Sequence, residues 1–155
     1  MTIINRLSVK RLLLLFLLLA PAAFTLAQNK NDLLTGFQTD LIKTGNSRYF
    51  QRFQTGAEGN YFLHKKFSAT GGIEYWSGNR QLSLTTGARW YPMEDAFIRF
   101  RGLLGANDFA VGGGWSMPVK ENLRFEALSD FYFAGHITIR VGFTYWIMNT
   151  SSGKK

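Results

Sequence analysis

The sequence of 155 residues contains no cysteine and only two histidines. Without cysteine the chain can form no disulfide, carries no thiol nucleophile and offers no cysteine ligand to zinc. The two histidines, His64 and His136, lie far apart in the chain, so no metal-binding motif is present. These absences indicate that packing and backbone pairing hold the chain together, and we expect no cofactor.

A long apolar run occurs only near the N-terminus. Arg6, Lys10 and Arg11 precede the apolar segment 12–20, and Pro21 and small residues follow it. This order predicts a secretory signal peptide. The apolar segment is short for a membrane-spanning helix, which needs about 20 apolar residues.

The predicted signal peptide covers residues 1–27, with cleavage after Ala27. Its removal takes away three positive charges and leaves 128 residues with a net charge of +5, against +8 for the whole chain. This length predicts one domain, at 28–147, followed by a C-terminal tail at 148–155. The charge is mild and no basic run occurs in the mature part, so we expect no nucleic-acid binding.

The rest of the chain shows no helical period and alternates between apolar and polar residues. Eight such segments, separated by turn residues, predict strands at 33–43, 50–63, 67–77, 81–91, 96–105, 109–117, 123–133 and 136–147. Short connections between all of them predict an antiparallel meander. A meander of eight strands closes into an up-and-down barrel, which removes the exposed strand edges.

Charged residues within the predicted strands fall on one of the two alternating faces. They are Asp40, Arg52, Glu58, Glu74, Arg89, Arg99, Arg101, Arg124, Glu126, Asp130 and Arg140. Six arginines against five carboxylates is a near balance, which a closed interior needs because an unpaired buried charge is costly. Lysines of the mature chain occur only in turns, tails and strand ends. We therefore expect a charge network in the interior, in which Arg124, Glu126 and Asp130 pair with charges on neighbouring strands.

The opposite face is apolar, and its large aromatic residues lie near the strand ends. Tyr61, Trp90, Trp115 and Tyr145 belong to one end of the predicted barrel, and Phe53, Tyr75, Phe109, Phe131 and Phe133 belong to the other. Two aromatic girdles that flank an aliphatic band are typical of a transmembrane β-barrel. The sequence thus predicts an all-β, eight-stranded antiparallel up-and-down transmembrane barrel, preceded by a cleaved signal peptide.

Two stretches carry a resemblance to a known group. They are GARWYPMEDAFIRFRGLLGANDFAVGGGW at 87–115 and the last strand, which contains GFTYWI at 142–147. Together with the whole pattern, they resemble the small eight-stranded outer-membrane barrels, such as the OmpA transmembrane domain and OmpX, within the porin-like group. The aromatic spacing of the last strand is similar to the family's C-terminal insertion signal, although here a tail follows it.

The resemblance implies a place in the outer membrane of a Gram-negative bacterium. Its implied partners are outer-membrane lipid and lipopolysaccharide, the assembly machinery during insertion, and a larger envelope complex. An eight-stranded barrel has an interior that side chains can fill, so we expect a plugged lumen and a structural role. The sequence provides no catalytic, cofactor-binding or metal-binding residue that we would assign.

Three alternatives remain open at this stage. A lipid A-modifying enzyme would use His136 as its base, with Thr138, Ser129 and Asp130 nearby. A narrow pore would need a continuous gap between the interior charges. A soluble ligand-binding barrel would place the apolar face inside and the charges outside.

Overall fold

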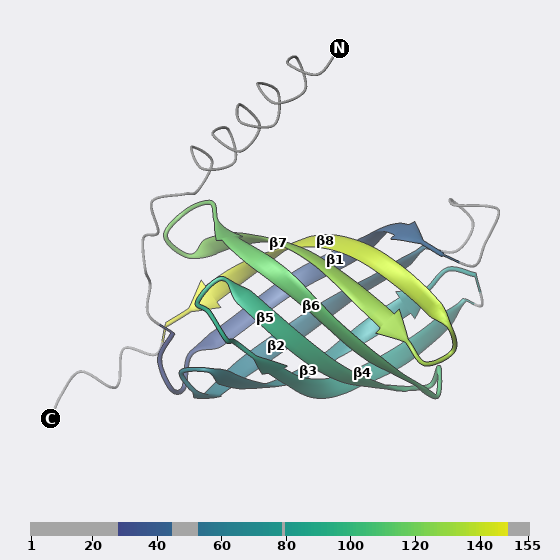
Figure 1. Ribbon diagram of the computed structural model, residues 1–155, viewed down its shortest axis with the longest axis horizontal. Coiled ribbons are helices and arrows are strands. Elements are labelled where there is room, and N and C mark those ends of the chain that lie inside the picture. Colours follow the sequence, from purple (N-terminus) through teal and green to yellow (C-terminus); the bar gives the residue numbers. More distant parts are fainter. Residues whose placement is uncertain (1–27, 45–52, 79, 149–155) are drawn as a thin grey trace, which may run out of the picture.

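The structure is a computed structural model that describes residues 28–44, 53–78 and 80–148. Its strands are β1 (Leu33–Lys43), β2 (Gln54–His64), β3 (Phe67–Trp76), β4 (Gln81–Trp90), β5 (Ala96–Leu104), β6 (Asp108–Pro118), β7 (Leu123–Tyr132) and β8 (His136–Ile147). Each strand pairs antiparallel with the next, and β1 pairs with β8 to close the barrel (Figure 1). The predicted all-β, eight-stranded antiparallel barrel is confirmed.

The strand boundaries lie close to those predicted from alternation. The largest difference is in β2, which begins at Gln54, whereas we expected a start at residue 50. Residues 50–52, the predicted signal peptide and nearly all of the predicted tail lie outside the described residues. Within the described residues, no helix is long and apolar enough to cross a membrane.

The barrel has two ends that the connections define. Leu33 of β1 pairs with Ile147 of β8, so both ends of the described chain lie at one end of the barrel, which we call the terminal end (Figure 1). The β2–β3, β4–β5 and β6–β7 turns lie at the same end. We call the opposite end, where Lys43 pairs with Thr138, the loop end.

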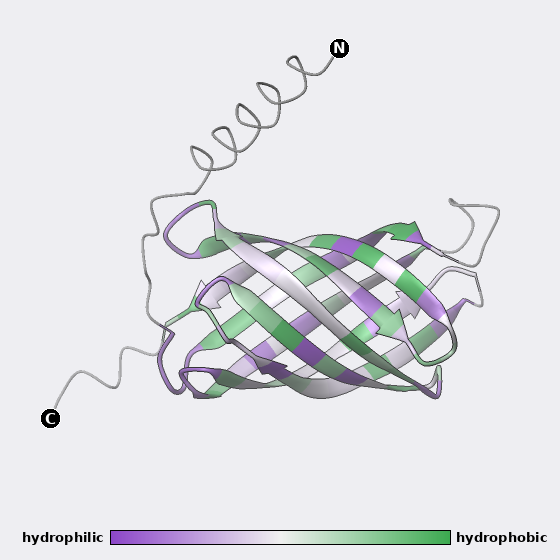
Figure 2. Ribbon diagram, in the orientation of Figure 1, coloured by the Kyte–Doolittle hydropathy of each residue, from purple (hydrophilic) through white to green (hydrophobic). Residues whose placement is uncertain are grey.

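Alternation along each strand separates polar from apolar side chains. Arg99 and Arg101 of β5 are 0% and 3% exposed, whereas Phe100 between them is 52% exposed. The strands accordingly show alternating hydrophilic and hydrophobic bands (Figure 2). The charged face lines the interior and the apolar face forms the outer wall, which is the reverse of a soluble barrel.

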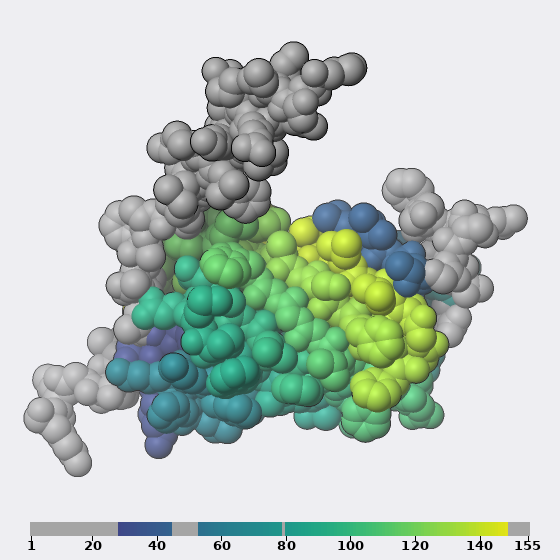
Figure 3. Space-filling model, viewed as in Figure 1, coloured from purple at the N-terminus to yellow at the C-terminus, as the bar shows by residue number. Residues whose placement is uncertain are grey.

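Three layers of side chains fill the interior. At the terminal end, six apolar and aromatic side chains form a buried cluster that we call the apolar plug: Leu34, Phe62, Tyr91, Phe97, Leu128 and Trp146. The charged residues occupy the middle, and Leu103, Ala110 and Tyr132 pack with Trp76 at the loop end. From outside, the side chains of β5 to β8 form a continuous surface over the face shown in Figure 3.

Candidate functional site in the barrel interior

Small residues stand beside the long charged side chains of the middle layer. Glu58 pairs across the strands with Gly72, Glu126 with Gly142, and Arg101 with Gly87. A Cβ at Gly72 or Gly87 would meet a backbone carbonyl of the neighbouring strand and the Cα of the charged residue. Glycine at these positions therefore permits the close approach of the strands beside the charges.

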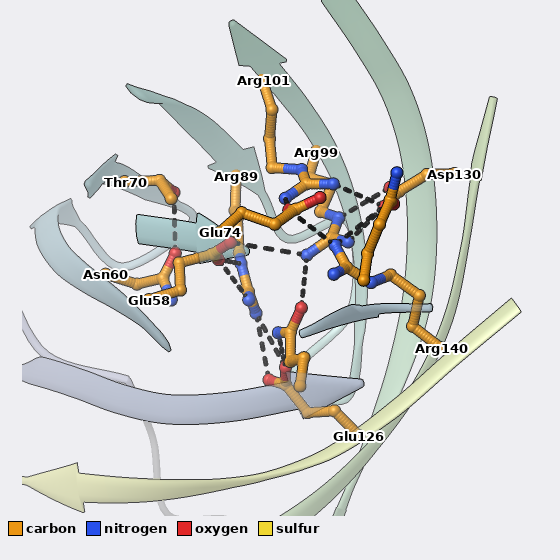
Figure 4. A network of polar contacts seen from close by, with 12 residues as sticks. Glu58, Asn60, Thr70, Glu74, Arg89, Arg99, Arg101, Glu126, Asp130 and Arg140 are labelled. Atoms are coloured by element: carbon orange, nitrogen blue, oxygen red, sulfur yellow. Dashed lines mark hydrogen bonds and ion pairs between the residues drawn. The ribbon is translucent and has the colours of Figure 1, made fainter. Parts of the chain in front are cut away.

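Arg89 on β4 joins two acids from opposite parts of the wall (Figure 4). Its Nε donates to Oε1 of Glu58 on β2 at 3.0 Å, and its Nη1 donates to Oε1 and Oε2 of Glu126 on β7 at 3.0 and 3.2 Å. Arg89 and Glu126 are fully buried. The guanidinium thus uses its fixed fork to hold two carboxylates that do not lie on adjacent strands.

Asp130 on β7 is the meeting point of the two arginines of β5. Its Oδ1 accepts from Arg99 Nε at 2.8 Å, its Oδ2 accepts from Arg101 Nη2 at 2.8 Å, and Arg99 Nη2 also contacts Oδ2. Arg101 Nη1 donates to Glu74 Oε2 at 2.7 Å. The Asp130 carboxylate therefore contributes to neutralising both arginines, which lie two residues apart on β5.

Arg140 on β8 completes the network towards β1 and β3. Its Nη1 donates to Oε2 of Glu74 at 3.0 Å, and its Nε lies 2.8 Å from Oδ1 of Asp40. Asp40 and Arg140 are direct partners in the β1–β8 ladder, just before the irregularity in β1 that follows Asp40. This pair links adjacent strands, as expected, whereas most of the other pairs join strands that are two or three apart in the barrel order.

The expectation of pairing between neighbouring strands is therefore largely wrong. Arg89 has another arginine, Arg99, as its cross-strand partner on β5, and both reach acids elsewhere. The reason is geometric, since eight strands enclose a lumen narrow enough for an arginine to span it. The broader prediction that buried Arg–carboxylate pairs fill the interior is confirmed.

Two of the predicted interior charges fall outside this middle network. Arg124 lies at the terminal end, where it contacts Asp95 in the β4–β5 turn and donates through Nε to Ser116 Oγ at 2.8 Å. Arg52 lies outside the described residues. The described middle network contains Arg89, Arg99, Arg101, Arg140, Asp40, Glu58, Glu74, Glu126 and Asp130.

Uncharged polar residues also belong to the network, although the sequence had not led us to expect them there. Gln38 Oε1 accepts from Arg99 Nη1 at 2.9 Å, and its Nε2 donates to Glu126 Oε2 at 3.1 Å. Tyr132 Oη accepts from Arg101 Nη2 at 2.9 Å. Both residues lie on the same alternating face as the charges of their strands, so the phase of the alternation was the signal that could have found them.

The apolar plug was also missed, because it consists of apolar residues on the polar face. Phe62 stacks on Trp146 with ring centroids 5.3 Å apart and packs against Tyr91 at 5.2 Å. The Arg89 guanidinium lies 4.3 Å from the centre of the Phe97 ring, where it joins the plug to the charges.

Little free space remains between the charges. A cavity of about 10 Å³ lies beside Gln38, Glu58, Glu74, Arg101 and Arg140. A volume of this size holds about one water molecule. The described interior is therefore filled by side chains in this layer, which does not favour the narrow-pore alternative.

The predicted aromatic girdle residues lie on the outer face. At the terminal end, Tyr61, Trp90, Trp115 and Tyr145 are exposed. At the loop end, the exposed residues are Phe53, Tyr75, Phe109, Phe131 and Phe133. Between the two groups, apolar side chains such as Phe100 and Leu84 cover the wall.

The residues of the enzyme alternative lie in different surroundings. His136 stacks on Tyr132 with ring centroids 4.2 Å apart, and Asp130 is engaged by Arg99 and Arg101. Ser129 is exposed on the outer face, on the side opposite Asp130. Over the described ranges, no group of three acidic or histidine residues is placed to hold a metal ion.

No family model matches the chain, and no curated protein matches it. Two solved structures of designed proteins share its fold. One comes from work described as "De novo design of transmembrane beta-barrels", with a TM-score of 0.58, 12% identity, and coverage of 78% of this chain and 99% of that chain. The other is the solution NMR structure of the de novo designed TMB2.3, with a TM-score of 0.59, 13% identity, and coverage of 78% and 98%. At such low identity the likeness concerns the fold alone, and the chain has the fold of eight-stranded transmembrane β-barrels.

Proposed function

We propose that the chain is an integral outer-membrane barrel of a Gram-negative bacterium, exported by a signal peptide at residues 1–27. Its role is structural: it contributes to envelope integrity or serves as a small subunit of a larger envelope assembly. Its surroundings are outer-membrane lipid and lipopolysaccharide, and the outer-membrane assembly machinery inserts it. This proposal extends the resemblance to the OmpA and OmpX group.

One observation carries the proposal. The outer wall is apolar and the interior is a filled network of buried Arg–carboxylate pairs, with an apolar plug at the terminal end. A wall of this kind is stable in lipid, and a filled interior supports a role that needs no passage of solute. The designed barrels of the same fold support a membrane location.

Cell fractionation followed by a heat-modifiability gel tests the location. The mature protein is extracted in detergent and run with and without boiling. We expect it in the outer-membrane fraction, with a mobility shift on boiling, because a closed barrel keeps its compact form until heated. A soluble periplasmic protein without a shift would contradict the proposal.

Two further assays test the structural role against its rivals. Purified protein in planar bilayers should show no stepwise conductance, and lipid A from cells that overproduce the protein should be unchanged. Stepwise conductance would favour the narrow pore. A change in lipid A that His136→Ala abolishes, while the heat-modifiability shift persists, would favour the enzyme.

A further inference from the structure

A hollow of about 340 Å³ lies at the terminal end of the barrel, where the β2–β3 turn meets the β4–β5 turn. Its lining includes Gln28, Lys65, Lys66, Tyr91, Met93 and Glu94. The volume is within the range of small-molecule sites, which measure about 300–1,000 Å³. None of these residues belongs to the charge network of the interior.

Hydrogen bonds between three chain segments hold the shape of the hollow. The backbone N–H of Tyr91 donates to the carbonyl of Lys66 at 3.0 Å and ties the two turns together. The Nε2 of Gln28 donates to the backbone carbonyl of Glu94 at 2.9 Å and ties the N-terminal segment to the same turn. These bonds fix the two turns and the N-terminal segment relative to one another.

The hollow presents the positive side chains of Lys65 and Lys66 and the negative side chain of Glu94, and the predicted cleavage after Ala27 adds the ammonium group of the new N-terminus at Gln28. Lys65, Lys66 and Glu94 are exposed side chains on its lining. Among the residues that the structure describes, none of the three forms an ion pair, whereas the interior charges are paired. Two ammonium groups suit a phosphate, and a single carboxylate suits a cationic amine.

The position of the hollow relates it to the membrane. Phe67 follows Lys66 directly, Trp90 precedes Tyr91 directly, and these two aromatics pair across β3 and β4 on the outer wall. They are 45% and 42% exposed. Aromatic residues of this kind lie at the depth of lipid headgroups, so the hollow lies just beyond the apolar wall, level with the headgroups.

We propose that this hollow binds the headgroup of an amine-bearing glycerophospholipid, with Lys65 and Lys66 on the phosphate and Glu94 on the ammonium group. The exposed thioether side chain of Met93, on the lining of the hollow, provides apolar contact for the glycerol end. The inference rests on the proposed membrane location, because only a barrel in a bilayer places this rim among headgroups.

Native mass spectrometry of the full mature chain, released from bilayers with equal parts phosphatidylethanolamine, phosphatidylcholine and phosphatidylglycerol, tests the site. We expect selective retention of phosphatidylethanolamine. The single variant Glu94→Gln should lower that retention about tenfold, the effect of losing one charge-assisted hydrogen bond, and the double variant Lys65→Gln/Lys66→Gln should lower it by at least that factor. Lys120→Gln changes an exposed lysine of the β6–β7 turn at the same end and should leave retention unchanged.

Each other outcome overturns the proposal. Equal retention of phosphatidylcholine excludes recognition of a primary amine, and retention that Glu94→Gln leaves unchanged excludes the assigned carboxylate. A loss with Lys120→Gln equal to that of the double variant would mean general charge attraction. A heat-modifiability gel on every sample separates the two proposals: a folded barrel without selective lipid contradicts only this site, whereas absence of a membrane barrel contradicts the proposed function.

Discussion

Arg89 shows how a single residue is held in the interior. It is fully buried and its guanidinium faces Glu58 and Glu126, which come from β2 and β7. A buried charge of this kind is tolerated only when partners compensate for the lost hydration. Removing the arginine would leave two carboxylates facing each other without their shared cation.

We therefore predict that Arg89→Met destabilises the barrel by about 3–5 kcal/mol, the cost of breaking a buried pair. Guanidinium titration in phospholipid vesicles, followed by the heat-modifiability gel, measures the free energy of unfolding. Adding Glu126→Gln to this variant should restore part of the loss, because one uncompensated charge disappears. A loss no larger than that of Lys120→Ala, an exposed change expected to stay within about 0.5 kcal/mol, would contradict the assigned role.

Two glycines provide a matched test of packing at the residue scale. A Cβ added at Gly87 on β4 would lie 1.9 Å from the carbonyl oxygen of Phe100 on the next strand, whereas one added at Gly71 meets nothing within 4 Å. Gly87→Ala should destabilise the barrel by about 1–3 kcal/mol or more. Gly71→Ala should be neutral or stabilise by up to about 1 kcal/mol. The same titration measures both, and equal effects would be inconsistent with this packing.

At the residue scale, the sequence predicts on which face of the barrel wall a side chain lies. It does not predict which residue that side chain pairs with. Arg99 could be assigned to the interior because it shares the alternating phase of Arg101 and the other charges. Its partners, Asp130 and Gln38, lie on β7 and β1. Those contacts depend on the diameter of the barrel and on the stagger of its strands, which no local pattern contains.

Single strands are the elements that alternation predicts best. All eight were expected, and most bounds lie within two residues of the observed ones, because turn residues interrupt the two-residue period clearly. The apolar plug was not expected, although Phe62 of β2 and Trp146 of β8 share the phase of Glu58 and Arg140. Alternation alone does not bring these two rings together, and only the closed barrel shows that they meet inside.

At the scale of elements, we predict that the apolar plug stabilises the contacts between strands. Phe62 is fully buried and contacts Tyr91 and Trp146, so it joins β2 to the β4–β5 turn and to β8. Phe62→Ala should cost about 3–5 kcal/mol, as for other core phenylalanines. Phe62→Leu nearly preserves the volume and should cost less than about 1.5 kcal/mol. Unfolding titrations of both variants check this, and a small loss with alanine would show that the plug adds little to stability.

For the whole molecule, we predict that the stability cost of a charge on the outer wall depends on its depth in the membrane. Phe100 lies midway along β5 and Phe133 lies beyond the end of β7, and both are exposed on the outside. Phe100→Arg should destabilise the barrel in vesicles by about 2–4 kcal/mol, and Phe133→Arg by about 0–1 kcal/mol. Unfolding titrations in bilayers measure the difference. Equal costs at the two sites would argue against a lipid-covered wall.

The central claim is that the apolar wall faces lipid and the charges face inward, and the absence of native cysteine permits a direct test. Single cysteines at Ile98, Phe100 and Leu104, three outward positions of β5, are labelled with a fluorophore in vesicles. Lipids brominated along the acyl chain and aqueous iodide then serve as quenchers. We predict strong quenching by brominated lipid at Phe100, with weaker quenching at the other two positions and little effect of iodide at Phe100. Quenching of Phe100 by iodide and not by brominated lipid would contradict it.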